Sequence, residues 1–119
     1  MMLDLTRGRD GQRLTGQSTQ GSYRVTRRPD HLSPGLYAAC ANAHVLPEVE
    51  ITIRRPSEDD PVVWRTWLVV TLTDVLVTGA VASVEAEAGA LETLAFNYMT
   101  ITWTWRGDGE VCEGSWTRG

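Results

Sequence analysis

The sequence contains no lysine, and it has only two histidines and two cysteines. A phosphate-binding loop of the P-loop type needs a lysine, and the early glycines do not stand between a strand and a helix. All eleven basic residues are arginines, spread from Arg7 to Arg118, and the net charge is −4. No basic run is present that would follow a phosphate backbone. These absences argue against nucleotide and nucleic acid binding.

Long hydrophobic runs are also missing. No apolar run reaches the roughly 18 to 20 residues that cross a bilayer as a helix. The start MMLDLTRGRD lacks the apolar segment of a secretory signal peptide. The sequence therefore predicts a protein with no membrane partner and no Sec-type export. Cys40 and Cys112 allow at most one disulfide, and two reduced thiols are the expected state.

Residues for catalysis or metal binding are sparse. His31 and His44 flank a predicted helix, and no cluster of cysteines or carboxylates has the spacing of metal ligands. Ser33 fits a helix cap, since no nucleophile motif surrounds it. Acidic residues occur in two predicted loops without the spacing of a calcium site, at Glu58, Asp59, Asp60, Glu85 and Glu87. The sequence predicts no enzyme, no metal and no cofactor.

Residues 8–22 are polar and rich in glycine, which predicts a flexible loop. A short strand is expected from Tyr23, and one helix over about residues 33–42. In that helix Ser33 would be the N-cap and Pro34 the first helical residue. One helical side would carry Leu36, Ala39, Cys40 and Ala43.

The rest of the chain favours β-strands. Glu48 to Arg54 alternates strictly, with Val49, Ile51 and Ile53 expected to face inward. The apolar run that begins at Val62 is too long for one straight strand. We expect it to break near Thr73 and Asp74 into two strands, or to bend there.

The segment from Leu91 to Trp105 has large apolar residues on both sides of an extended strand. A β-bulge near Tyr98 and Met99 would move the inward set from one side to the other. Both sides could then face one core, or one side could face a neighbouring subunit. The residues assigned to such core or inter-subunit packing are Phe96, Tyr98, Ile101, Trp103 and Trp105.

Four segments, in order and spacing, resemble the Hcp family of haemolysin-coregulated proteins over about residues 20–105. They are SPGLYAAC from Ser33, EVEI from Glu48, LTDVLV from Leu72, and the run from Leu91 through FNY to Trp103. The resemblance implies a mainly β fold, an antiparallel β-barrel or two-sheet sandwich with one short helix, in a single domain of residues 1–119.

The resemblance also implies a function without catalysis. Hcp proteins form hexameric rings that stack into the hollow tube of the bacterial type VI secretion system, and effectors travel in the lumen. The expected partners are therefore copies of the chain, effectors and other type VI components. The expected location is the bacterial cytoplasm, with secretion through the apparatus. The alternative is a monomeric or dimeric Hcp-like adaptor that forms no tube.

Two further expectations follow from the family. The loop at residues 8–22 corresponds to the family loop that reaches the next ring, so Arg9, Gln12 and Arg13 are the candidate stacking residues. Family members usually begin with an additional N-terminal segment that holds the first strand or strands of the barrel, and the strand-like Met2–Thr6 would be a remnant of it. Three explanations for this difference compete: a start upstream of the given sequence, a shortened paralogue, or a strand donated by a neighbouring copy. Thr100, Thr102 and Thr104 are candidates for the side of the tube wall that faces water in the lumen.

Overall fold

The computed structural model describes residues 2–6, 15–19, 22–107 and 112–118. These residues contain eight strands and one helix. In chain order they are β1 (Met2–Thr6), β2 (Thr15–Thr19), β3 (Ser22–Arg27), α1 (Ser33–Ala41), β4 (Val45–Pro56), β5 (Trp64–Glu85), β6 (Gly89–Asn97), β7 (Thr100–Trp105) and β8 (Cys112–Thr117). The expected mainly β fold with one short helix is confirmed.

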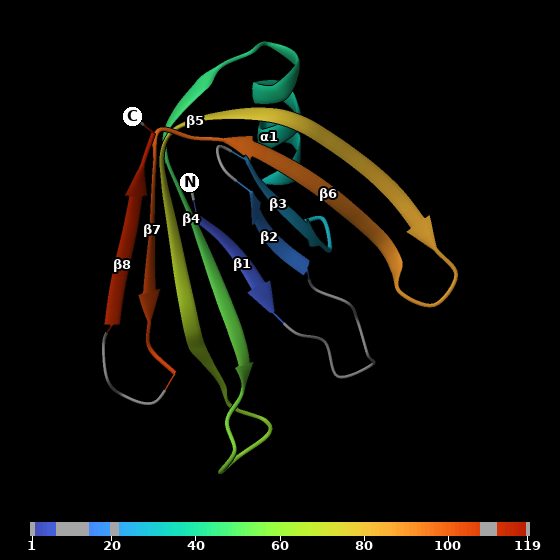
Figure 1. Cartoon of the computed structure of the whole chain (residues 1–119). Helices are drawn as coiled ribbons and strands as arrows, with labels where there is room; N and C mark the ends of the chain where they lie inside the picture. The colour runs from blue at the N-terminus through green and yellow to red at the C-terminus, as the bar shows by residue number, and fades with distance from the viewer. Residues whose placement is uncertain (1, 7–14, 20–21, 108–111, 119) are drawn as a thin grey trace.

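The eight strands form one continuous hydrogen-bonded sheet, which folds over at β5 into two layers (Figure 1). We call these layers the two sheets, and β5 belongs to both. Its residues 68–73 pair with β7, and its residues 76–85 pair with β6. Between these parts Asp74 has a φ of 50°, in the left-handed region. Asp tolerates this conformation better than most residues because its short polar side chain can bond locally. Of the two expectations for this run, the bent strand is the one observed.

The chain leaves one sheet and enters the other at Tyr98 and Met99. The ladder with β5 stops at Asn97 and resumes at Thr100. Phe96 before this corner and Ile101 after it are both fully buried in one hydrophobic cluster. The expected single bulged strand is therefore wrong: two strands meet at a corner. The change of sheet turns both sets of side chains toward the same core.

Helix α1 packs against β5 and begins and ends differently from the expectation. Ser33 is the first helical residue and Leu32 is the N-cap, so the predicted Ser33 cap is wrong. The Ser33 hydroxyl instead accepts a hydrogen bond from the Asp30 N–H, at 3.0 Å. At the other end Ala43 has a φ of 51°, and the His44 N–H donates to the Ala39 carbonyl at 2.9 Å. This is a Schellman-type ending, which leaves Ala43 exposed rather than on the buried side.

The N-terminal part corrects two further expectations. Residues 15–19 of the predicted flexible loop form β2, which pairs with β3. Their polar residues lack the apolar alternation that marks a half-buried strand. Residues 8–14 and 20–21 lie outside the described residues. Met2–Thr6 forms a strand as expected, but it pairs with β4 in parallel, so the sheet is not purely antiparallel.

The core lies between the two sheets and under the helix. Among the described strands, the path of pairing ends at β1 on one side and at β2 on the other, and β8 pairs only with β7. The core contains the side chains of Tyr23, Val25, Leu36, Ala39, Val49, Ile51, Val70, Leu72, Val75, Val77, Leu94, Phe96, Tyr98 and Ile101.

Candidate functional site

The five predicted packing residues fall into two groups. Phe96, Tyr98 and Ile101 are buried within the single chain, with at most 3% of their surface exposed. Trp103 is half-buried and packs against the same core. Trp105 is half-buried too, and its ring lies edge-on to Trp67 with centroids 5.3 Å apart. The first group therefore stabilises the chain itself, while both tryptophans keep partly accessible surface.

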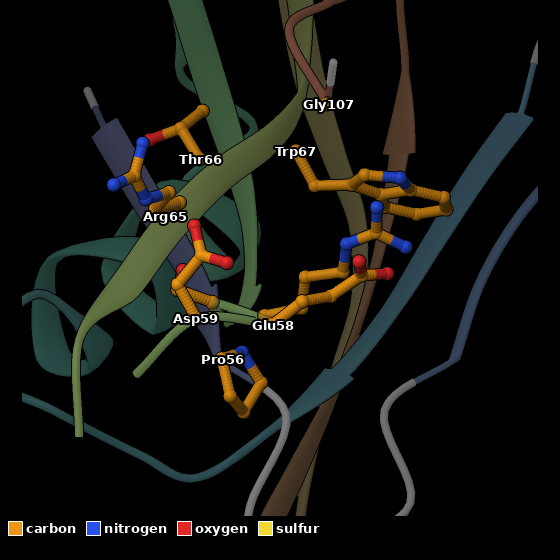
Figure 2. A pocket seen from close by; sticks show the side chains of 9 residues that line it. Pro56, Glu58, Asp59, Arg65, Thr66, Trp67 and Gly107 are labelled. Atoms are coloured by element: carbon orange, nitrogen blue, oxygen red, sulfur yellow. The ribbon is translucent and has the colours of Figure 1, made fainter. Parts of the chain in front are cut away.

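A groove of about 330 Å³ lies beside Trp67, whose ring contacts that of Trp105. Figure 2 shows Trp67 and Gly107 at one end and Pro56 at the other. The Arg55 guanidinium lies 5.5 Å from the centre of the Trp67 ring, within reach of a cation–π interaction. The Trp67 Nε1 is buried without a hydrogen-bond partner among the described residues. No histidine or cysteine is among the lining residues of this groove.

A polar face covers the side of the β4–β5–β7–β8 sheet that is opposite the core. Neighbouring strands bring hydroxyl groups into register, as in the row Thr71, Thr102 and Ser115. The next row contains Thr73, Thr100 and Thr117, and the hydroxyls of the last two lie 3.4 Å apart. We call this the threonine face; its members are Thr71, Thr73, Thr100, Thr102, Thr104, Ser115 and Thr117.

The threonine face carries charge only at its margins. Glu50 and Arg54 on β4, Glu113 on β8 and Arg106 after β7 lie around the hydroxyl rows. A shallow hollow of about 610 Å³ lies over this part of the sheet. Such a surface offers hydrogen bonds without a strong electrostatic field of one sign. It suits contact with water or with varied polar surfaces.

A buried ion pair ties the second sheet to the segment before the helix. Arg27 on β3 donates from Nε to Oε2 of Glu92 on β6 at 2.7 Å, and both side chains are almost completely buried. The same guanidinium donates two bonds to the Asp30 carboxylate, at 2.7 and 2.9 Å. The Tyr37 hydroxyl of α1 donates to the other Glu92 oxygen. We call Arg27, Asp30, Tyr37 and Glu92 the quartet; Arg27 and Glu92 are buried, Tyr37 is half-buried and Asp30 is exposed.

The contacts in the quartet shift two pKa values. Partial burial acts to raise the pKa of the Asp30 carboxyl, but hydrogen bonds from Arg27 and Leu32, and the Arg27 and His31 charges, lower it overall. The hydrogen bond to Glu92 raises the pKa of the Tyr37 hydroxyl, and burial acts in the same direction. Both shifts favour the forms that hold the network together: an ionised Asp30 and a protonated Tyr37.

Sequence reasoning missed Arg27 and Glu92, although a signal for them exists. Arg27 lies on the same side of β3 as the buried Tyr23 and Val25. Glu92 likewise shares a side of β6 with Leu94 and Phe96. One charge of each sign at an inward position of two strands predicts a buried pair, because an isolated buried charge is too costly.

The other predicted residues take no part in a site. His31 and His44 are exposed. Within residues 22–107 and 112–118, where side chains are described, no group of three potential metal ligands occurs. Cys40 and Cys112 are both free thiols. In the described part of the chain, no helix is long and apolar enough to cross a membrane. Arg9, Gln12 and Arg13 lie outside the described residues.

The chain matches the family model described as "Type VI secretion system effector, Hcp" over residues 3–105. A comparison with curated protein sequences gave no match.

Solved structures with a similar fold include secreted protein Hcp3 from Pseudomonas aeruginosa, at a TM-score of 0.70 and 23% identity, covering 87% of this chain and 69% of that one. Hcp1 from Salmonella typhimurium has a TM-score of 0.70 and 18% identity, covering 89% and 76%. A type VI secretion system effector from Yersinia pestis has a TM-score of 0.66 and 17% identity, covering 90% and 81%.

Proposed function

Because the chain belongs to the Hcp family of the type VI secretion system, we propose that it is a structural subunit of the secretion tube. In this proposal six copies close into a ring, rings stack into a hollow conduit, and effectors pass through its lumen. The chain performs no catalysis, and it leaves the bacterial cytoplasm through the apparatus.

The family match carries this proposal, and the distribution of polar and apolar surface supports it. The threonine face gives the β4–β5–β7–β8 sheet a wall of hydroxyl groups with charge at its margins. We assign this face to the lumen, where a conduit has to stay wet and bind cargo weakly. The sheet edges at β1, β2 and β8 have no second partner among the described strands. Neighbouring copies would cover such edges in an assembly.

A head-to-tail contact closed by rotation generates a ring without two-fold symmetry, so the two contacting surfaces of each copy can differ. The stacking role of Arg9, Gln12 and Arg13 is part of the proposal. Deletion of residues 8–14 should leave single rings intact and abolish their stacking into tubes.

Light scattering coupled to size-exclusion chromatography tests the proposal directly. The expected mass is six times the 13.2 kDa of one chain, with longer particles visible by electron microscopy at high concentration. A mass of one or two chains across the accessible concentration range would instead support an Hcp-like adaptor that forms no tube. Repeating the measurement with added type VI effectors checks whether cargo drives ring closure.

A further inference from the structure

The hairpin of β5 and β6 extends beyond the rest of its sheet (Figure 1). Strand β3 pairs with β6 only from Glu92 to Phe96, so residues 83–91 form a two-stranded ribbon at the tip and Val81 lies just before it. Val81 is 63% exposed and Val84 is 84% exposed. A two-stranded ribbon is marginally stable in water without a covering surface. The tip therefore needs a partner surface more than any other part of this sheet.

The charges of the tip are of one sign. Residues 76–91 contain two charged residues, Glu85 and Glu87, and both are exposed carboxylates. The ribbon thus presents small and apolar side chains, among them Val84, around a net charge of −2. A surface that fits this tip has to be basic.

The opposite charge lies on the outer side of β3, on the same sheet. Arg24 on β3 and Arg28, which directly follows the last residue of β3, are exposed, whereas Arg27 is buried. Strand β2 beside it has no charged residue, and the single carboxylate of β6, at Glu92, is buried. Among the described residues, β2, β3 and β6 carry no exposed carboxylate, and the exposed carboxylate that follows β3, Asp30, is paired with Arg27. We call Arg24 and Arg28 the arginine ridge.

We propose that the acidic tip of one copy binds the arginine ridge of the next copy. Each chain has a net charge of −4, so copies repel one another unless their contact pairs opposite charges locally. The tip and the ridge are different surfaces of the same chain. Each copy can therefore give its tip to one neighbour and accept the tip of another, which is the contact that a closed ring requires. This inference rests on the proposed ring and assigns the surfaces that hold it together.

A charge-swap experiment tests the contact. Glu85→Arg with Glu87→Arg should raise the concentration at which rings dissociate by about tenfold or more, since each chain then presents like charges to its neighbour. Arg24→Glu with Arg28→Glu should weaken the ring similarly. The chain with all four substitutions should regain rings at close to the wild-type concentration. The matched control, Glu58→Arg with Asp59→Arg on another exposed turn, should leave the ring unchanged.

Mass photometry or sedimentation measures the dissociation, and circular dichroism checks that each variant is folded. Rings that survive either reversal at the wild-type concentration overturn the contact, and so does a folded four-fold variant that stays dissociated. A wild-type chain that is monomeric at all concentrations refutes the proposed function itself, which is a distinct result.

Cross-linking provides an independent readout that does not depend on variant stability. With Cys112→Ser as background, Glu87→Cys together with Arg24→Cys should form disulfides between copies under mild oxidation. The pair Asp59→Cys with Arg24→Cys should not. Rings that contain the first pair but form no link between copies would also overturn the proposal.

Discussion

At the scale of single residues, the quartet of Arg27, Asp30, Tyr37 and Glu92 makes the strictest demand on side-chain pairing, because it contains a buried ion pair. Glu92 is fully buried, and its two oxygens accept bonds from Arg27 and Tyr37. Arg27 uses its remaining donors on Asp30. A buried ion pair offsets the cost of desolvation only if its hydrogen bonds are satisfied. The quartet meets this condition and joins β3, β6 and α1.

Removal of the Glu92 charge should therefore be costly. Glu92→Gln keeps the size of the side chain but leaves Arg27 without its buried counter-charge, so we expect a loss of about 3 kcal/mol in the free energy of unfolding. Urea unfolding followed by circular dichroism measures this loss. The control Glu87→Gln, at an exposed position of the β5–β6 turn, should change stability by less than about 0.5 kcal/mol.

Replacement of both charged residues distinguishes the cost of an unpaired buried charge from the contribution of the ion pair itself. Arg27→Met with Glu92→Leu leaves no unpaired buried charge and should recover most of the loss seen in Glu92→Gln. A cost below about 1 kcal/mol for Glu92→Gln would contradict the assigned role of the pair.

The pH dependence of stability has a definite sign at Asp30. Its carboxyl has a lowered pKa in the folded chain, relative to an ordinary value of 3.8. The unfolded chain therefore binds a proton more readily, and the stability due to Asp30 is present above about pH 4 and lost as the pH falls through the folded pKa. Asp30→Asn lacks this contribution. The difference in unfolding free energy between wild type and variant should be largest near pH 5 and shrink toward pH 2.5; a constant difference would contradict it.

At the scale of elements, two features organise the fold: the bend of β5 at Asp74 and the corner at Tyr98 and Met99. The Met99 N–H donates to the Thr73 carbonyl at 2.9 Å, which holds the corner against the bend. The two sheets diverge from this corner, one with β7 and the other with β6, and the hydrophobic core fills the space between them. Packing is tight at the end of β7, because the rings of Trp67 and Trp105 meet there and leave no room for a side chain at Gly107.

A methyl group at Gly107 tests this packing. A Cβ there would lie 2.5 Å from Cζ2 of Trp105 and 2.8 Å from Cδ1 of Trp67. Gly107→Ala should therefore cost about 1 to 3 kcal/mol and change the near-ultraviolet dichroism of the tryptophans. The control is Gly114→Ala on the neighbouring strand β8, where a Cβ would have no atom within 4 Å. That substitution should not destabilise the chain, since alanine restricts the unfolded state. Equal effects of the two substitutions would contradict the packing argument.

At the scale of the whole molecule, the two faces of the β4–β5–β7–β8 sheet have different roles. The inner face carries Leu72 and Ile101 into the core, and the outer face carries the threonine rows. The proposed tube places this outer face toward the lumen. The arginine ridge and the acidic tip belong to the other sheet, so the channel wall and the proposed contact between copies use separate surfaces.

Thiol labelling checks the assignment to the lumen. Thr102→Cys, in a Cys112→Ser chain, should react with a small maleimide in assembled tubes but react at least about tenfold more slowly with a maleimide on a large polymer. A reagent that cannot enter the channel cannot reach the thiol. The control Ala38→Cys lies at an exposed position of α1 and should react with both. Equal labelling of Thr102→Cys by both reagents would place the threonine face outside the channel.

Much of the fold could be predicted from local patterns. Strict alternation with apolar Val49, Ile51 and Ile53 marks β4, and Pro34 with a short apolar stripe marks α1 within one residue of its observed end. These signals are local because a strand repeats every two residues and a helix every 3.6. The ordered segments also sufficed to identify the family, which the match over residues 3–105 confirms.

The sequence by itself thus determined the β-rich class, the single helix and the family. Only the tertiary structure decided which sides of the strands share a core, because that depends on neighbours far away in the chain. Arg27 and Glu92 meet across 65 residues, and β1 lies beside β4 in parallel. The periodicity of one strand shows that its two sides differ, but the partner that buries a side, or neutralises a charge on it, is supplied by the fold.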